Sequence, residues 1–224
     1  RMSHLAGLFA HVRDRAVAAA TARDDADLII VGHAGTVRLP AGARRLPQRG
    51  RGLGERFVRA LEDVRALGYD QIVAIGSDSP SLEGVNVHQA FEALDGGSGF
   101  VLGPAADGGV YLLGLSGTVP ASLRQVPWGT RRVFDGLLAQ LGPAAILAQR
   151  LDDVDGPRGL WRLRRAGALP AALARELLRL IRPLVWPRRT QVTLPSSTLS
   201  EILHVVSWRG PPTFPRLDWS CLFR

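Results

Sequence analysis

The chain contains no lysine among its 224 residues, so all 28 of its basic side chains are arginine. It has one cysteine, Cys221, which excludes an intrachain disulfide and indicates a reducing compartment. No apolar run reaches membrane-spanning length, and no secretory signal pattern is present. These absences predict a cytoplasmic protein without a membrane span.

The net charge of +8 is unevenly distributed along the chain. Residues 1–155 contain 16 arginines against 17 acidic residues, whereas residues 156–224 contain 12 against 3. The arginines of the second part are scattered among proline and leucine, without the basic, aromatic-bearing face that nucleic-acid binding requires. Nucleic acid is therefore not an expected partner, and the five histidines show no metal-ligand spacing.

Apolar runs of strand length alternate with helical periods through the first two thirds of the chain. This alternation predicts the α/β class, with a mostly parallel sheet covered by helices on both faces. We expect strands at 27–32, 72–75, 100–102, 110–113 and 144–151, and helices at 2–20, 53–66, 84–94 and 130–141, the last with Thr130 as a candidate N-cap. Residues 34–52 are expected to form a loop.

Three parts follow from this pattern. Residues 1–165 are expected to form the main domain and residues 166–185 a carboxyl-terminal helix. Residues 186–224 contain five prolines and no sustained period, which predicts a poorly ordered tail. Within that tail we expect one short strand or helix near Ile202 to Val206.

One aspartate follows the apolar run that ends at Ile75. The sequence Gly76-Ser77-Asp78-Ser79-Pro80 lets the chain leave a strand tightly and places Asp78 at the carboxyl end of that strand. A carboxylate there can hold a divalent cation, and the cation can bind a diphosphate. The alternative is a helix-capping or turn residue.

A second aspartate lies between two apolar runs. In Gly103 to Tyr111, Gly108 and Gly109 allow close approach of the backbone beside Asp107. Asp107 can position an acceptor hydroxyl or act as a general base. Alternatively, it is only a hairpin-turn residue.

An ordered set of short motifs runs through the chain: Leu46-Pro47-Gln48-Arg49-Gly50, Leu53-Gly54-Glu55-Arg56, Gly76 to Pro80, Gly103-Pro104-Ala105 with Asp107-Gly108-Gly109, Pro127-Trp128 with Thr130, and Asp153-Val154-Asp155. This set resembles the bacterial GT-A-type transferases associated with radical-SAM proteins, often called arsenosugar-biosynthesis glycosyltransferases. The resemblance covers about residues 5–165 and implies the sandwich fold of nucleotide-diphospho-sugar transferases, which also includes the molybdenum-cofactor and F420-precursor nucleotidyltransferases.

The resemblance implies roles for particular residues. Asp78 and Asp155 are expected to bind Mg²⁺ or Mn²⁺, and Asp107 is the expected catalytic residue. Substrate-binding roles fall on Glu55, Arg56, Ser79, Gly108, Gly109, Trp128 and Thr130. Simpler interpretations stay open: helix capping for Asp155, capping with a surface ion pair for Glu55 and Arg56, and a buried loop aromatic for Trp128.

The family begins with a strand and a basic loop before the position of Arg1, so the resemblance also predicts an amino-terminal truncation. The leading hypothesis is a metal-dependent glycosyltransferase that takes a nucleotide-sugar donor and a small-molecule acceptor. A nucleotidyltransferase that releases pyrophosphate and a non-catalytic remnant are the alternatives. The sequence leaves the oligomeric state open.

Overall fold

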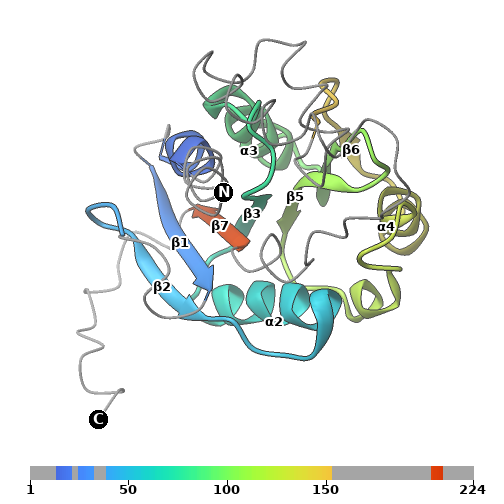
Figure 1. Ribbon diagram of the computed structural model, residues 1–224, viewed down its shortest axis with the longest axis horizontal. Coiled ribbons are helices and arrows are strands. Elements are labelled where there is room, and N and C mark those ends of the chain that lie inside the picture. Colours follow the sequence, from blue (N-terminus) through green and yellow to red (C-terminus); the bar gives the residue numbers. More distant parts are fainter. Residues whose placement is uncertain (1–13, 22–24, 33–38, 153–202, 209–224) are drawn as a thin grey trace, which may run out of the picture.

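A computed structural model describes residues 14–21, 25–32, 39–152 and 203–208, the last of these as backbone. Its single sheet has seven strands in the order β2-β1-β7-β3-β5-β4-β6 (Figure 1). The strands are β1 (Ala26–Gly32), β2 (Arg44–Pro47), β3 (Gln71–Gly76), β4 (Phe100–Pro104), β5 (Val110–Ser116), β6 (Ala145–Ile146) and β7 (Leu203–Trp208).

Five of the strands run in one direction, and β5 and β7 run in the other. Strand β1 is parallel to β2, and β4 is parallel to β6, whereas every pairing that involves β5 or β7 is antiparallel. The predicted predominance of one strand direction is therefore confirmed. The sheet is nevertheless mixed, because four of its six pairs of neighbouring strands are antiparallel. Because they share one direction, β1, β2, β3, β4 and β6 all end at one edge, here named the carboxyl edge.

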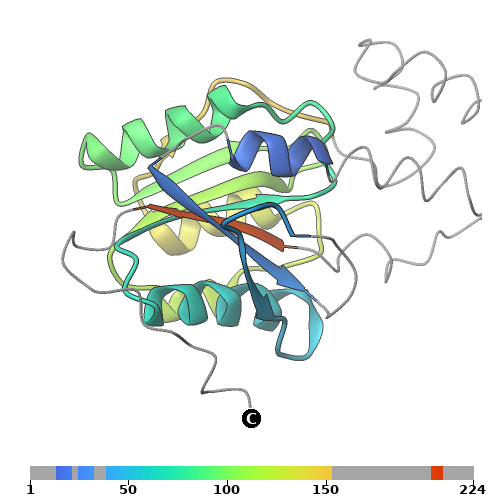
Figure 2. The same ribbon diagram turned by 90° about the vertical axis from the view of Figure 1, so that its left-hand side faces the viewer.

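Helices cover both faces of the sheet (Figure 2). Helix α3 (Gly84–Asp95) and the helical residues 14–20 lie on one face, and α2 (Gly52–Ala66) and α4 (Val133–Leu141) lie on the other. Alternate residues of the strands divide between the two apolar layers. In β3, for example, Val73 and Ile75 join the first layer and Ile72 and Ala74 the second. This period of two produces the α/β/α sandwich.

Most of the predicted elements are confirmed, with shifts at their ends. The loop expected at 34–52 contains strand β2, whose short polar sequence carries no alternation. The strand expected at 144–151 is reduced to β6, followed by an isolated parallel bridge between Ala105 and Leu151. The helix expected to begin at Thr130 begins at Val133, with Arg132 as its N-cap.

The largest correction concerns the tail. Residues 203–208 are not part of a poorly ordered tail, because they form strand β7 inside the sheet (Figure 1). Strand β7 pairs antiparallel with both β1 and β3, which lie far from it in the sequence. The short strand or helix predicted near Ile202 to Val206 is confirmed as a strand, but no local signal in the sequence predicted that it pairs with β1 and β3. The predicted helix at 166–185 and the rest of the tail lie outside the described residues.

Within residues 14–21, 25–32, 39–152 and 203–208, no helix is both long and apolar enough to cross a bilayer.

Candidate functional site

Several predicted site residues meet at the carboxyl edge. Asp78 lies two residues after β3, and Asp107 lies three residues after β4. Because β3 and β4 point the same way and only β5 stands between them, their ends are about 10 Å apart. Both aspartates therefore belong to one edge of the sheet, where open α/β folds bind ligands.

The Asp78 turn leaves strand β3 with its carboxylate folded back. A Cβ placed on Gly76 would lie 2.6 Å from Asp78 Oδ1, so only glycine permits this approach. Ser79, the next residue, is 1% exposed, and its Oγ has no hydrogen-bond partner among the described residues. A buried hydroxyl without a hydrogen-bond partner lowers the stability of the fold, and the Ser79 hydroxyl can still form a hydrogen bond with a ligand.

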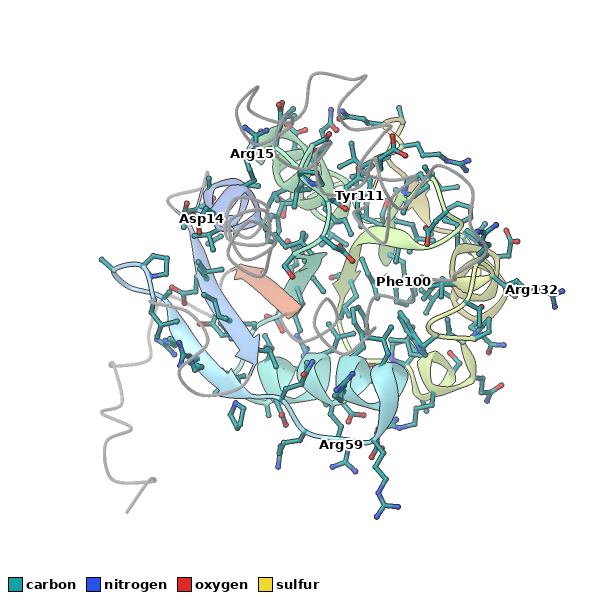
Figure 3. The ribbon with its side chains drawn as sticks, in the orientation of Figure 1. Asp14, Arg15, Arg59, Phe100, Tyr111 and Arg132 are labelled. Atoms are coloured by element: carbon teal, nitrogen blue, oxygen red, sulfur yellow. The ribbon has the colours of Figure 1, made fainter. Side chains whose placement is uncertain are left out.

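A distant helix holds the same turn. Arg15 Nε, from the helical residues 14–20, donates to the carbonyl oxygen of Pro80 at 3.3 Å. Its Nη2 also lies 3.4 Å from Glu83 Oε1, at the N-cap of α3 (Figure 3). Glu83 and Asn86 form a capping box there, which fixes how the chain passes from the turn into α3.

The Asp107 turn is closed mainly by its own backbone. Asp107 Oδ1 accepts a hydrogen bond from the backbone N–H of Gly109 at 2.8 Å, and the N–H of Ala105 donates to the carbonyl of Gly109 at 3.0 Å. This is the geometry of an aspartate-stabilised turn, the simpler of the two interpretations. It also orients the carboxylate, as a general base or an acceptor-positioning residue requires.

Gly108 fastens this turn to the start of α4. Its φ is +95°, and an added Cβ would lie 2.1 Å from the carbonyl oxygen of Arg131. The carbonyl of Gly108 in turn accepts from the N–H of Phe134 at 3.0 Å. Gly108 and Gly109 therefore have backbone roles that are independent of any ligand.

A further aspartate lies beside this turn. The N–H of Ala106 donates to the carbonyl of Leu151 at 2.8 Å, which places the backbone of the partly buried Asp152 close to that of Ala106, the residue before Asp107. The sequence argument selected Asp153 and Asp155, which lie outside the described residues, and missed Asp152. The acidic run at 152–155 was the available signal, but only the bridge between Ala105 and Leu151 shows which of its residues comes near this turn in the backbone.

A complete metal centre is not formed by the side chains that the structure describes. Within residues 14–21, 25–32, 39–152 and 203–208, no three histidine, cysteine, aspartate or glutamate residues are grouped as metal ligands. Asp78 is one half of the predicted pair, and Asp155 is not described. Metal binding therefore stays a prediction.

Glu55 is engaged at the beginning of α2. The backbone N–H of Arg51 donates to Glu55 Oε2 at 2.7 Å, and Arg59 Nη2 lies 2.7 Å from Oε1. The hydrogen bond from Arg51, followed by the contacts with Arg59, lowers the pKa of Glu55. This arrangement is that of helix capping with a surface ion pair, the simpler interpretation of Glu55.

Two polar atoms near the same helix start lack partners. Arg56 Nε and Gln48 Oε1 are buried without a hydrogen-bond partner among the described residues. Gln48 directly follows β2, and α2 begins five residues after β2, so both residues belong to the carboxyl edge. Gln48 stands in one of the family-like motifs but was not selected as a site residue.

Trp128 is a packing residue in this structure. Its ring lies 4.5 Å from that of Phe57 between centroids, and its Nε1 donates to the carbonyl of Leu123 at 2.8 Å. A Cβ on Gly54 would come within 2.3 Å of Trp128 Cδ1, so α2 is pressed against the indole. The exposed Thr130 donates to the carbonyl of Pro127 at 2.7 Å and accepts from the N–H of Arg132 at 3.2 Å, which closes a turn.

The comparisons with known proteins agree with this fold. Residues 8–130 match the family described as "Uncharacterized protein conserved in bacteria (DUF2064)", and the chain belongs to that family. It is also similar to a crystal structure from Desulfovibrio desulfuricans G20, described as a "putative nucleotide-diphospho-sugar transferase". The TM-score is 0.66 and the identity 26%, over 81% of this chain and 86% of the other. None of the curated proteins compared with the chain matches it.

Proposed function

We propose that the protein is a metal-dependent glycosyltransferase that takes a sugar from a nucleotide-diphosphate donor and passes it to a small-molecule acceptor. The observation that carries this proposal is the placement of the Asp78 and Asp107 turns at one edge of the sheet, at the ends of β3 and β4. The structural relative described as a nucleotide-diphospho-sugar transferase makes this donor class the first to test. Arsenosugar-type biosynthesis is the setting that the sequence motifs suggest.

Asp78 and Asp155 would hold Mg²⁺ or Mn²⁺, both of which prefer carboxylate oxygens. The chemistry of Asp78 fits, since this residue is partly buried at the carboxyl edge, and the hydroxyl of the next residue, Ser79, has no hydrogen-bond partner among the described residues. A bound cation neutralises the charge of a leaving diphosphate. Asp155 supplies the second oxygen ligand in this proposal.

Asp107 would orient or deprotonate the acceptor hydroxyl. Its bond from the Gly109 N–H holds one carboxylate oxygen in place, so the group meets the acceptor in a fixed orientation. Arg131 and Arg132, both exposed at the start of α4, add positive charge beside this turn. Figure 3 shows Arg132 on the outside of α4, where an incoming anionic group can meet it.

The test compares two aspartates at opposite ends of β3. Asp78 follows the strand, whereas Asp70 precedes it and forms an exposed ion pair with Arg65 at 2.8 Å. We expect the parent chain and Asp70→Ala to bind UDP or GDP with Mn²⁺ in calorimetry, and Asp78→Ala to lose about a hundredfold or more in affinity. If the parent binds neither nucleotide, the proposed function is wrong. If Asp78→Ala binds as the parent does, Asp78 is a turn residue.

A product assay separates the two transferase classes. The chain is incubated with nucleotide sugars in one series and with nucleoside triphosphates plus phosphorylated acceptors in another. Release of a nucleoside diphosphate supports the glycosyltransferase. Release of pyrophosphate in the second series supports a nucleotidyltransferase instead.

A further inference from the structure

Strand β7 stands where the order of the strands reverses. From β1 the chain moves outward to β2, then crosses the sheet to β3 and continues to the strands on the other side. In open α/β sheets such a switch point opens the crevice that receives the ligand. Strand β7 fills the position between β1 and β3, and it begins at the carboxyl edge, because Leu203 pairs with both Val31 and Gly76.

Gly76, the last residue of β3, pairs with β7 but not with β5. On its other side β3 pairs with β5, but that register ends at Ile75 opposite Leu112. Gly76 lies one residue further and pairs with Leu203 of β7. Within the described sheet, β7 is therefore the strand whose register extends to Gly76.

The carboxylate of Asp78 rests on this same glycine. The distance of 2.6 Å from Asp78 Oδ1 to the position of a Gly76 Cβ shows that the side chain lies directly over the end of β3. A shift of the Gly76 backbone would therefore move the carboxylate or open space beneath it. The place of Asp78 is linked through Gly76 to Leu203.

We propose that β7 is a positioning strand for Asp78. This inference rests on the proposed function, in which Asp78 binds a cation-bound diphosphate. Pairing at Leu203 fixes Gly76 and so keeps the Asp78 carboxylate where that diphosphate can reach it. Because such coupling is reciprocal, a bound nucleotide stabilises the pairing of β7.

The experiment uses the full chain and two proline substitutions at opposite ends of β7. Proline removes the backbone N–H of the substituted residue and fixes its φ, and both changes disturb the pairing of β7 at that position. Leu203→Pro acts at the level of Val31 and Gly76, whereas the matched control Ser207→Pro acts at the level of Asp27 and Ile72, toward the other edge. The first readout is hydrogen exchange of the amides of Gly76 to Ser79 without ligand, and the second is affinity for GDP with Mn²⁺.

In Leu203→Pro we expect these amides to exchange about tenfold faster or more, and the Mn²⁺-dependent affinity to fall by a similar factor. Ser207→Pro should keep both values within about threefold of the parent. In the parent chain, GDP with Mn²⁺ should slow the exchange of the amides of residues 203–206. A Leu203→Pro chain whose turn exchanges at the parent's rate would overturn the proposal.

Both variants can fail to fold, so native-state exchange of the parent chain in dilute denaturant is the second measurement. We expect the amides of Gly76 to Ser79 to open together with those of β7. Opening together with β5, and separately from β7, would overturn the inference. If the parent binds no nucleotide, the proposed function fails, while the exchange readouts still decide whether β7 positions the turn.

Discussion

The two aspartate-bearing turns at the carboxyl edge are built in different ways. The Asp107 turn is closed by two hydrogen bonds within five residues, from Ala105 to Gly109, and it is also fastened to α4 through Gly108 and to Leu151 through Ala106. The Asp78 turn depends on partners far away in the sequence. Arg15 lies 65 residues before Pro80, and Leu203 lies 127 residues after Gly76. A turn closed locally keeps its shape when distant elements loosen, whereas a turn held from a distance responds to them.

This difference assigns separate tasks to the two aspartates in the proposed reaction. A self-contained turn suits a residue that must keep one orientation, as a general base does. A turn held by a distant strand and a distant helix can couple ligand binding at the Asp78 turn to the pairing of β7 in the sheet. The predictions below test how far the Asp107 turn is self-contained and how far the Asp78 turn is not.

The largest effect is expected from Gly108→Ala. The substitution forces a side chain into a positive φ and places Cβ 2.1 Å from the Arg131 carbonyl oxygen. We expect a loss of about 2–4 kcal/mol in the free energy of unfolding, measured with urea. The control is Gly142→Ala, where φ is +72° but no atom lies within 4 Å of the added Cβ, so only about 1–2 kcal/mol is lost. Equal losses would show that the contact with Arg131 is unimportant.

Tyr111 tests whether the Asp107 turn depends on a distant partner after all. Its hydroxyl donates to the carbonyl of Gln149 at 3.2 Å, and burial raises its pKa to about 12. Since the unfolded chain releases this proton near pH 10, the stabilisation is complete below pH 10 and is lost as the pH rises through about 12. The parent should lose up to about 2 kcal/mol over this range by urea unfolding.

In Tyr111→Phe this alkaline loss should be absent. The alkaline loss of stability can be assigned to Tyr111 because the chain has no lysine and only one other tyrosine, Tyr69. An unchanged alkaline slope in Tyr111→Phe would show that another group titrates. Hydrogen exchange of the amides of Asp107 to Gly109 in the same variant reports on the turn, and we expect parent-like rates there.

Asp107 can be separated into its structural and chemical roles. Asp107→Ala removes the acceptor for the Gly109 N–H and should cost about 1 kcal/mol in the free energy of unfolding. Asp107→Asn keeps an acceptor and should stay within about 0.5 kcal/mol of the parent. Transfer from a nucleotide-sugar donor should nevertheless be lost in both variants if Asp107 is the base. Full activity in Asp107→Asn would leave this residue with the turn role alone.

The smallest effect is expected at the helix that holds the Asp78 turn. Arg15→Ala removes a hydrogen bond to Pro80 and a partly exposed ion pair with Glu83. We expect about 0.5 kcal/mol in urea unfolding, with faster exchange of the Gly76 to Ser79 amides. Arg59→Ala, which removes another exposed ion pair, should leave those amides unchanged. The same exchange rate in both variants would show that Arg15 does not hold the turn.

Local patterns in the sequence predicted the α/β class, most of the helices and strands, and both aspartate-bearing turns. Those features depend on a period of two or of 3.6 residues, or on glycine and aspartate at a turn, and all of these are visible within a few residues. The capping of α2 by Glu55 was likewise predictable, because the helix start and its acidic residue are adjacent. The role of Trp128 could not be predicted from the sequence, because the same local sequence allows the indole either to pack on Phe57 or to stack on a ligand.

Tertiary structure alone decided which distant residues complete the site. Backbone pairing identifies no partner in advance, because every strand offers the same donors and acceptors. The position of Leu203–Trp208 between β1 and β3, and the bridge between Leu151 and Ala105, could therefore not be read from composition or spacing. The sequence determined the two turns and the layers that bury its apolar residues. The fold determined that Gly76, beside the carboxylate of Asp78, pairs with a strand that begins 127 residues further along the chain.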